Sequence, residues 1–433
     1  MAQGTLWIDV TDLTTWTGNL TGIQRTHFHL GQEFAKQPGV KFFAASYDKG
    51  IREVGLPTTE SFEEKGKKPG FREQSTLAKY AGKGTRFANR MIHKVLPGKL
   101  SRAFDRVAAG INGTVSDLVF GISKKREKKV LHPFTSEDTV LILGATWGTP
   151  DFPELLCSLK REVGFKLIFT VYDLIPVYAP HFFGPGFGGH YSRYLMNTIS
   201  ASDALLSISQ HTAKDLKHFM NELLIPEIPI INFRLGDNPL EVVGEHGPSA
   251  DIEAGNFVLA VGTVEVRKNH QALYLAWELA AKEGIELPPL VIVGKPGWNV
   301  SDLLYDISAN PLVNKKIKIV SGIDDATLGW LYNNCLMTVY PSWYEGWGLP
   351  VAESLHFGKV CISSSASSMP EIGGDLVDYC SPYEPRAFMN KIYEYALNPE
   401  LLKKAEKRID AKYRSVTWEE SFQEIWNGLE KLS

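Results

Sequence analysis

Short apolar runs rich in β-branched residues recur along the chain, each followed by a polar or helical stretch, and they fall into two series. The first series comprises residues 5–10, 40–46, 140–143, 166–172 and 204–209, and the second comprises residues 257–261, 290–293, 317–320, 337–340 and 360–363. Short, continuously apolar strands that alternate with helices are typical of parallel sheets covered on both faces. Two such series therefore predict an α/β protein with two doubly wound, Rossmann-like domains.

The length of the chain suits this arrangement, because 433 residues with 44% hydrophobic content can bury two sizeable cores. The apolar pattern gives way to Gly, Pro, Ser and acidic residues over residues 244–255, where we expect the join. The predicted domains are residues 1–245 and 246–415, followed by a final segment over residues 416–433. Ligands of open α/β sheets bind beyond the carboxyl ends of the strands, so an interdomain cleft is the expected site.

Two helices of the second domain have recognisable starts. Asn269 is predicted to cap a helix that ends near Lys282, and Asp325 to cap a helix over residues 326–335. The apolar residues of the first helix have the spacing of one buried stripe, formed by Leu273, Leu275, Ala276 and Leu279.

The segment EGWGLPVAE, residues 345–353, places two glutamates around a glycine-rich turn that opens a helix. Gly346 and Gly348 allow backbone amides to approach a ligand closely, and Pro350 suits the first helical turn. With Glu345 before the helix and Glu353 in its first turn, the two carboxylates can accept hydrogen bonds from different parts of a phosphorylated sugar. The alternative is a solvated loop charge and a carboxylate that only complements the helix dipole.

The segment VGTVEVRKN, residues 261–269, follows a predicted strand and leads into a helix. Gly262 permits a tight turn, while Arg267 and Lys268 supply adjacent positive charge. An arginine can hold a phosphate through two hydrogen bonds, and a lysine acts as a mobile point charge. A diphosphate site and a solvated basic turn are both compatible with this segment.

With these motifs, the chain resembles retaining glycosyltransferases of the two-domain GT-B fold, in the family 4-like group that has two glutamates with seven residues between them. The resemblance rests on residues 345–353, on residues 262–268 and on Gly294. It extends more loosely to residues 17–25 and 171–180.

The resemblance implies roles for individual residues. Arg267 and Lys268 should hold the donor diphosphate, Glu345 should contact the transferred sugar, and Glu353 should accept from the ribose hydroxyls. The residues implied to bind the donor are Gly18, Gly22, Gly262, Arg267, Lys268, Gly294, Glu345, Gly346, Trp347, Gly348, Leu349 and Glu353.

One loop departs from the family pattern. In TVYDLIP, residues 170–176, Tyr172 stands where a histidine commonly precedes the aspartate. Asp173 joins Glu345, Arg267 and Lys268 as a candidate catalytic residue, although capping the following turn is an equally good interpretation. Arg25, Tyr172 and Asp173 are the candidate acceptor-binding residues.

The function implied by the resemblance is transfer of a sugar, with mannose or rhamnose as candidates, from a nucleotide-sugar donor to a carbohydrate or lipid-linked acceptor. Surface polysaccharide or glycolipid synthesis is the implied setting. In the mechanism favoured for this group the departing phosphate takes the acceptor's proton. Neither a metal nor another cofactor is expected if Arg267, Lys268 and the helix amides stabilise the leaving group. A nucleotide-sugar epimerase of the same fold and a catalytically silent membrane-associated scaffold are the alternatives.

Residues 65–129 carry 17 Lys and Arg against four acidic residues, a net charge of +13 that leaves −16 on the rest of the chain. Within this segment, residues 86–95 and 100–111 have apolar positions at helical spacing. A solvated insertion packed on the amino-terminal domain, or a surface for an anionic membrane or a lipid-phosphate acceptor, explains this pattern. We expect no nucleic-acid partner, because the segment lacks a binding motif and regularly interleaved aromatic residues.

The remaining features predict a cytoplasmic protein, with a peripheral position at the inner face of the membrane as an alternative. Residues 1–10 lack the pattern of a secretory signal, and no apolar run is long enough to span a bilayer. The four cysteines lack metal-ligand spacing and are expected to be reduced: Cys157, Cys335, Cys361 and Cys380.

The carboxyl-terminal segment TWEESFQEIW, residues 417–426, predicts a capped amphipathic helix. Its expected buried stripe consists of Trp418, Phe422 and Trp426. The resemblance implies that this helix crosses back to the amino-terminal domain.

Overall fold

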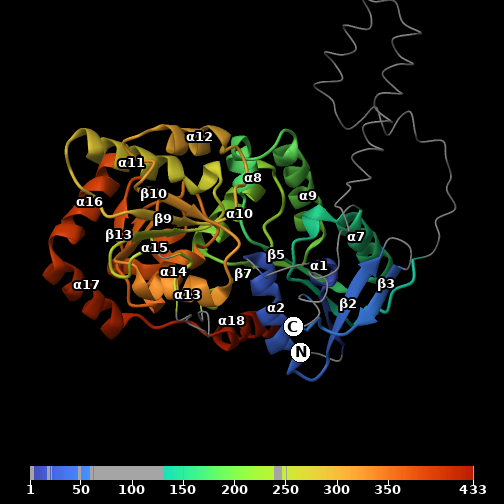
Figure 1. The fold of residues 1–433 in the computed structure, drawn as a ribbon. Helices are drawn as coiled ribbons and strands as arrows, with labels where there is room; N and C mark the ends of the chain where they lie inside the picture. Colours follow the sequence, from blue (N-terminus) through green and yellow to red (C-terminus); the bar gives the residue numbers. More distant parts are fainter. Residues whose placement is uncertain are drawn as a thin grey trace, which may run out of the picture. The chain divides into compact units, whose positions relative to one another are not determined.

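The computed structural model describes residues 4–16, 20, 22–46, 50–58, 62, 130–149, 151–237, 246–249 and 251–432 (Figure 1). By compactness, Met1–Pro57 with Pro133–Ser433 form one unit, and Thr58–His132 form another. Gly18 and the basic segment over residues 65–129 lie outside the described residues, so the predictions for them stay predictions. No helix in the described part of the chain is long and apolar enough to cross a membrane.

The first half of the chain forms a seven-stranded sheet with the order β3-β2-β1-β4-β5-β6-β7. All neighbouring strands are parallel except β2 and β3, which are antiparallel. The strands are β1 (Leu6–Asp9), β2 (Val40–Ser46), β3 (Gly50–Val54), β4 (Thr139–Ile142), β5 (Lys166–Val171), β6 (Ala204–Ser207) and β7 (Ile230–Asn232).

The second half forms a six-stranded, wholly parallel sheet with the order β10-β9-β8-β11-β12-β13. Its strands are β8 (Val258–Val261), β9 (Leu290–Val293), β10 (Ile317–Val320), β11 (Met337–Tyr340), β12 (Cys361–Ser364) and β13 (Asp378–Cys380). The predicted α/β fold with two doubly wound sheets is thus confirmed. The sequence pattern missed β3, β7 and β13, which are edge strands and are short or carry charged residues.

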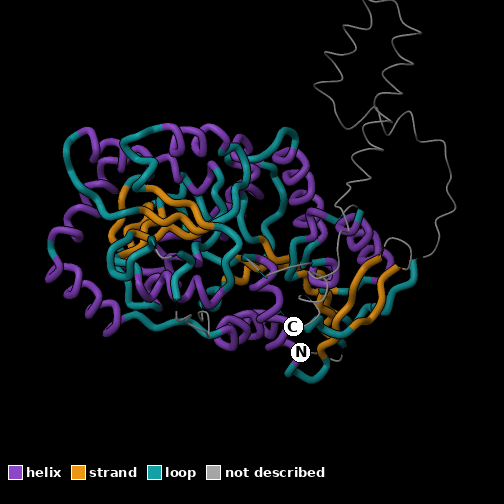
Figure 2. Tube along the Cα trace, in the orientation of Figure 1, coloured by secondary structure: helices purple, strands orange, loops and turns teal. Residues whose placement is uncertain are grey.

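Helices follow most strands and cover the sheets (Figures 1 and 2). In the first half they are α1 (Thr11–Thr15), α2 (Ile23–Ala35), α7 (Phe152–Val163), α8 (Ile175–Tyr178), α9 (Phe187–Ala201) and α10 (Gln210–Glu222). In the second half they are α11 (His270–Lys282), α12 (Ser301–Ala309), α13 (Asp325–Asn334), α14 (Leu349–His356), α15 (Met369–Gly373), α16 (Pro385–Leu397) and α17 (Pro399–Lys412). Figure 1 shows α11 and α12 on one side of the second sheet and α13 and α14 on the other.

The two predicted helix starts need correction. Asn269 precedes α11, but its side chain forms no cap; its amide instead donates to the carbonyls of Pro341 and Pro382, at 3.0 and 2.9 Å. Leu275 of α11 is 38% exposed, because the buried face of this helix includes Tyr274 and Trp277 instead. The cap of α13 is Asp324, one residue before the predicted Asp325.

The final helix, α18 (Trp418–Lys431), packs against α2 and β7 of the first sheet, as predicted. It begins with a capping box between Thr417 and Glu420. Its buried residues include Trp418, Phe422, Ile425 and Leu429, whereas Trp426 is only half-buried at the flank of this stripe. The Phe422 ring meets Phe34 of α2 edge-on, with ring centroids 4.9 Å apart.

Because the Phe422 side chain is buried at this contact, we expect Phe422→Ala to lower the free energy of unfolding by about 3 kcal/mol. Gln423→Ala, at the exposed neighbouring position, is the control and should change it by less than about 0.5 kcal/mol. Urea denaturation of both variants measures the difference. Equal stability of the two variants would show that α18 does not depend on this contact.

Candidate active site

The loops that follow β8, β11 and β5 come together at the carboxyl ends of these strands. The backbone N–H of Trp343, after β11, donates to the carbonyl of Arg267, after β8, at 2.9 Å. A Cβ atom on Gly346 would lie 2.2 Å from the carbonyl oxygen of Tyr172, after β5. Only glycine therefore allows the Glu345 loop to approach the TVYDLIP loop this closely.

A buried carboxylate, Glu345, lies between two cations. Its Oε2 atom accepts a 2.6 Å hydrogen bond from Arg267, and its Oε1 atom accepts one of 2.7 Å from Lys268. The Tyr340 hydroxyl also donates to Oε1, at 2.9 Å, and Arg267 makes a second ion pair with Glu265 at 2.7 Å. Arg267 and Lys268 are thus balanced by two carboxylates, Glu345 and Glu265.

The cations determine the charge state of the cluster. Burial alone would raise the pKa of Glu345, but Arg267 and then Lys268 lower it to about 2. Burial lowers the pKa of Lys268, and attraction to Glu345 offsets this only in part. Glu345 is therefore charged at neutral pH, and three donors already use three of the roughly four lone-pair positions of its carboxylate.

Two serines from a distant loop hold the backbone around Glu345. The Ser367 hydroxyl accepts from the Glu345 N–H at 2.8 Å. The Ser368 hydroxyl lies 2.9 Å from the Glu345 carbonyl and 2.6 Å from the Trp347 carbonyl. Since these bonds fix the backbone on both sides of Gly346, the loop presents its groups in one geometry.

Glu353 lies in the second turn of α14, one turn deeper than predicted, and is buried. Its Oε2 atom accepts from the Tyr332 hydroxyl at 2.7 Å. Its Oε1 atom accepts from Arg25 of α2 at 3.3 Å. The structure thus brings Arg25, a predicted acceptor-side residue, to the carboxylate expected to bind ribose.

The TVYDLIP loop gives Tyr172 and Asp173 different environments. The buried Tyr172 hydroxyl donates to the Leu143 carbonyl at 2.7 Å, which favours a structural role over acceptor binding. Asp173 accepts from the Ile175 N–H at 3.0 Å, so it does cap the following turn. Burial raises the pKa of Asp173, and Arg267 opposes this, which places its carboxyl within the field of the ion cluster.

The predicted glycines occupy the surrounding turns. A Cβ atom on Gly294 would lie 2.0 Å from the carbonyl oxygen of Gly262, so the loops after β9 and β8 touch there. Gly348 immediately precedes α14, whose first residue is Leu349, and Gly22 immediately precedes α2. The buried Trp347 has the guanidinium of Arg234 over its ring, 5.8 Å from the centroid.

A second buried cluster supports the amino-terminal side of the site. Asp12 of α1 pairs with His27 of α2 at 2.8 Å, which ties α1 to α2. Asp9 lies at the end of β1, where its Oδ1 atom accepts from the Thr11 N–H at 3.0 Å. Its Oδ2 atom has no hydrogen-bond partner among the described residues.

Several residues that hold this site were not predicted from the sequence. Glu265 and Tyr340 stand in or beside the quoted motifs, so their polar side chains were an available signal. Ser367 and Ser368 gave none, because they lie more than twenty positions from the loop that they support. None of the residues that the structure describes form a His, Cys, Asp or Glu group suited to a metal ion, and the expected independence from metals stays a prediction.

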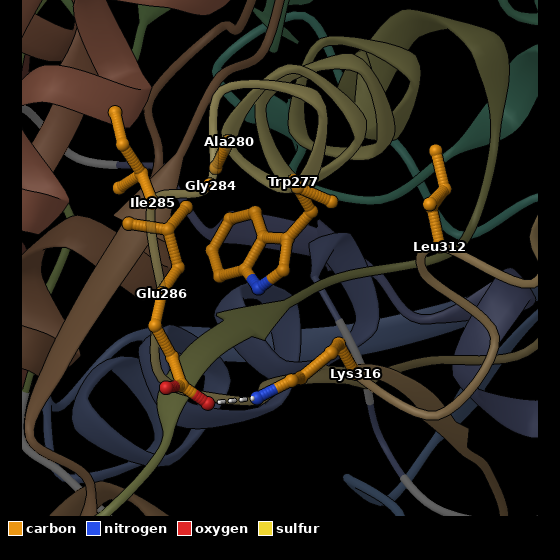
Figure 3. Close-up of a pocket in the computed structure, with 9 residues that line it drawn as sticks. Trp277, Ala280, Gly284, Ile285, Glu286, Leu312 and Lys316 are labelled. Carbon is orange, nitrogen blue, oxygen red and sulfur yellow. Dashed lines mark hydrogen bonds and ion pairs between the residues drawn. The ribbon is translucent and has the colours of Figure 1, made fainter.

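A cavity of about 240 Å³ elsewhere in the second half is not part of this site (Figure 3). It is lined by residues that include Trp277, Leu287, Leu312 and the ion-paired Glu286 and Lys316. Leu287 and Lys316 precede β9 and β10, so the cavity lies at the amino ends of these strands. The motif residues gather at the opposite edge.

Comparison with known proteins agrees with this geometry. Residues 245–412 match the family described as Glycosyl transferases group 1. We call this matched part of the chain the group 1 domain. It contains the ion cluster and both motif glutamates.

A relative from Escherichia coli, described as serotype-specific mannosyltransferase WbdA, is 30% identical over 275 residues. The match covers 60% of this chain and 33% of the relative, so the chain spans about a third of that protein's length.

Solved structures that match the whole chain show the fold. Sucrose-phosphate synthase from Thermosynechococcus elongatus has a TM-score of 0.59 with 16% identity, covering 99% of each chain. Anabaena HepE in complex with UDP has a TM-score of 0.58 with 12% identity, covering 99% of this chain and 100% of its own. The group 1 domain and the amino-terminal sheet together have the GT-B fold.

Because Glu345 is a buried carboxylate shared by two partly buried cations, we expect Glu345→Gln to lower the free energy of unfolding at pH 7 by about 3 kcal/mol. Glu286→Gln breaks the exposed pair with Lys316 and should leave stability unchanged. Thermal unfolding compares the two variants. A Glu345→Gln variant as stable as the wild type would show that the cluster is not a structural constraint.

The pKa of Asp9 predicts that the free energy of unfolding depends on pH. Burial, and then the charge of Asp12, raise this pKa to about 7. A carboxyl that binds its proton more tightly when folded makes the free energy of unfolding fall as pH rises from about 4 to about 7. The Asp9→Asn variant has no carboxyl at this position and does not lose stability in this way. The free energy of unfolding of the variant, minus that of the wild type, should therefore rise by about 2 kcal/mol between pH 5 and pH 8. Parallel pH profiles in urea denaturation would contradict this assignment.

Proposed function

We propose that the protein is a retaining glycosyltransferase that moves a sugar from a nucleotide-diphosphate sugar to a carbohydrate or lipid-linked acceptor. The observation that carries the proposal is the Arg267–Glu345–Lys268 cluster at the carboxyl edge of the group 1 domain. It combines anion-binding cations on the loop after β8 with a fixed carboxylate on the loop that leads into α14, the helix that carries Glu353.

Arg267 and Lys268 bind the donor diphosphate and stabilise the charge that grows as it departs. Because Glu265 and Glu345 already balance the two cations, the diphosphate also draws on the backbone amides that precede α14 and on the positive end of its dipole. This combination explains how the site holds a diphosphate without a metal ion.

Glu353 accepts hydrogen bonds from the ribose hydroxyls. Tyr332 occupies one of its oxygens from inside the group 1 domain, whereas Arg25 reaches the other from the amino-terminal half, at a longer distance of 3.3 Å. The donor ribose therefore replaces the Arg25 contact and leaves its guanidinium free for phosphate or acceptor groups. Tyr332 continues to orient the carboxylate.

Glu345 positions the sugar and does not attack it. Its two ion pairs and lowered pKa keep it charged but reduce its reactivity as a nucleophile. The bond from the acceptor oxygen to the anomeric carbon forms on the face where the bond to the phosphate oxygen breaks. Because both events occur on one face, the configuration is retained, and the acceptor's proton passes to that phosphate oxygen.

Asp173 acts at the acceptor side of the same centre. It caps its own turn and lies within the field of Arg267, so the two roles considered for it are compatible. Mannose is the favoured sugar and surface polysaccharide synthesis the favoured setting, because the relative from Escherichia coli is described as a serotype-specific mannosyltransferase.

A donor screen tests the proposal. The protein is incubated with GDP-mannose, UDP-glucose, UDP-N-acetylglucosamine or dTDP-rhamnose, with candidate acceptors and EDTA, and release of nucleoside diphosphate is measured. We expect release that depends on acceptor, survives EDTA and gives a product with the donor's anomeric configuration. Inversion would contradict the mechanism. Epimerised donor without transfer, or no binding of any nucleotide sugar, would favour the epimerase or the scaffold instead.

Variants of the donor site sharpen this screen. Glu353→Gln should weaken nucleoside diphosphate binding about tenfold in calorimetry, because a carboxylate acceptor for ribose is lost. Tyr305→Phe, at a 70% exposed position of α12, is the control and should bind like the wild type. Equal affinities of the two variants would remove Glu353 from the nucleotide site.

A further inference from the structure

A carboxylate of the group 1 domain accepts hydrogen bonds from the first turn of helix α10, which belongs to the amino-terminal half. The side chain of Glu371, in α15, accepts from the backbone N–H groups of Gln210 and His211, both at 2.7 Å. These amides have no acceptor within their own helix, and the positive end of the helix dipole favours the negative charge. Glu371 thus fixes the start of α10 against the group 1 domain.

Tyr344 contacts the same helix beside this point. Its hydroxyl donates to the carboxylate of Asp215 and lies 3.0 Å from Nε2 of His211. The Tyr344 and His211 rings also meet edge-on, with centroids 5.3 Å apart. Since His211 and Asp215 are one turn apart on α10, both side chains lie on the same face of the helix and contact the Tyr344 hydroxyl together.

Both contacts lead directly to the proposed catalytic carboxylate. Tyr344 precedes Glu345 in sequence, and its carbonyl accepts from Arg267 at 3.1 Å. Glu371 follows closely after Ser367 and Ser368, whose hydroxyls hold the backbone of Glu345. The position of Glu345 therefore depends on the position of α10 through two sets of hydrogen bonds, one at Tyr344 and one at Glu371 and the two serines.

We propose that Tyr344 is a positioning residue, whose contact with Asp215 and His211 places Glu345 and Arg267 correctly only while α10 is docked against the group 1 domain. Glu371 fixes the start of α10, so that His211 and Asp215 lie where they contact Tyr344. The inference rests on the proposed function, because it assigns Tyr344 a role in that reaction. Tyr344 itself need not touch donor or acceptor.

Tyr344→Phe tests this role, because it removes the hydroxyl and keeps the ring. With GDP-mannose as donor, we expect kcat to fall about 30-fold and the donor KM to change less than about threefold, since misplacement affects the reacting geometry more than ground-state binding. The melting temperature should stay within a few degrees of the wild type, and Tyr305→Phe should retain full kcat. An unchanged kcat for Tyr344→Phe would overturn the proposal.

A double-mutant cycle identifies the partner. Asp215→Asn should lower kcat as Tyr344→Phe does, and the double variant should be little worse than either single variant, because both remove the same contact. If the double variant instead lowers kcat by the product of the two single-variant reductions, the two residues act independently. This result would also overturn the proposal.

Hydrogen exchange tests the same contact without any substrate. Peptides over residues 343–348 should exchange faster in Tyr344→Phe than in the wild type or in Tyr305→Phe, because the Trp343 and Glu345 amides report the loop position. Unchanged exchange would refute the positioning role even if the protein is a glycosyltransferase. Conversely, faster exchange in a protein inactive with every donor would support the positioning contact and reject only the proposed function.

Discussion

The hydrogen-bonded ion cluster of Arg267, Glu345 and Lys268 is the constraint on which the arrangement of the site depends. A buried carboxylate is tolerated only when its partners stay in place, so the cluster locks the loop after β8 to the loop after β11. Those loops meet because β8 and β11 are hydrogen-bonded neighbours in the sheet, with their carboxyl ends at the same edge. The order of the strands thus brings together residues nearly eighty positions apart, and their charges hold them there.

The local part of this arrangement could be predicted from the sequence. Continuous apolar runs identified the central strands, and β2, β9, β10 and β11 begin and end at the predicted residues. Contacts between distant segments could not be predicted in the same way, because periodicity describes one element at a time. Asn269 illustrates this limit: its residue type suggested a helix cap, but tertiary structure uses its amide to join the Pro341 and Pro382 loops.

The chain passes between the two halves at two places that are joined to each other. The Asp237 N–H donates to the Val416 carbonyl at 2.9 Å, and the Asp237 carboxylate accepts from the Val416 N–H at 2.5 Å and also from Tyr413. Arg234, which pairs with Asp237 at 3.0 Å, extends over the ring of Trp347 beside Glu345. The crossing segments therefore contact the same loop that α10 contacts through Tyr344, so the relation between the halves and the geometry of Glu345 are physically linked.

We propose that Arg267 and Lys268 exchange part of their interaction with Glu345 for the diphosphate of a nucleotide. A crystal structure of the protein with GDP or UDP tests this most directly. We expect phosphate oxygens about 3 Å from the Arg267 guanidinium and the Lys268 ammonium group, with the ribose hydroxyls at Glu353. A nucleotide bound elsewhere, with the ion cluster unchanged and closed to the phosphates, would contradict it.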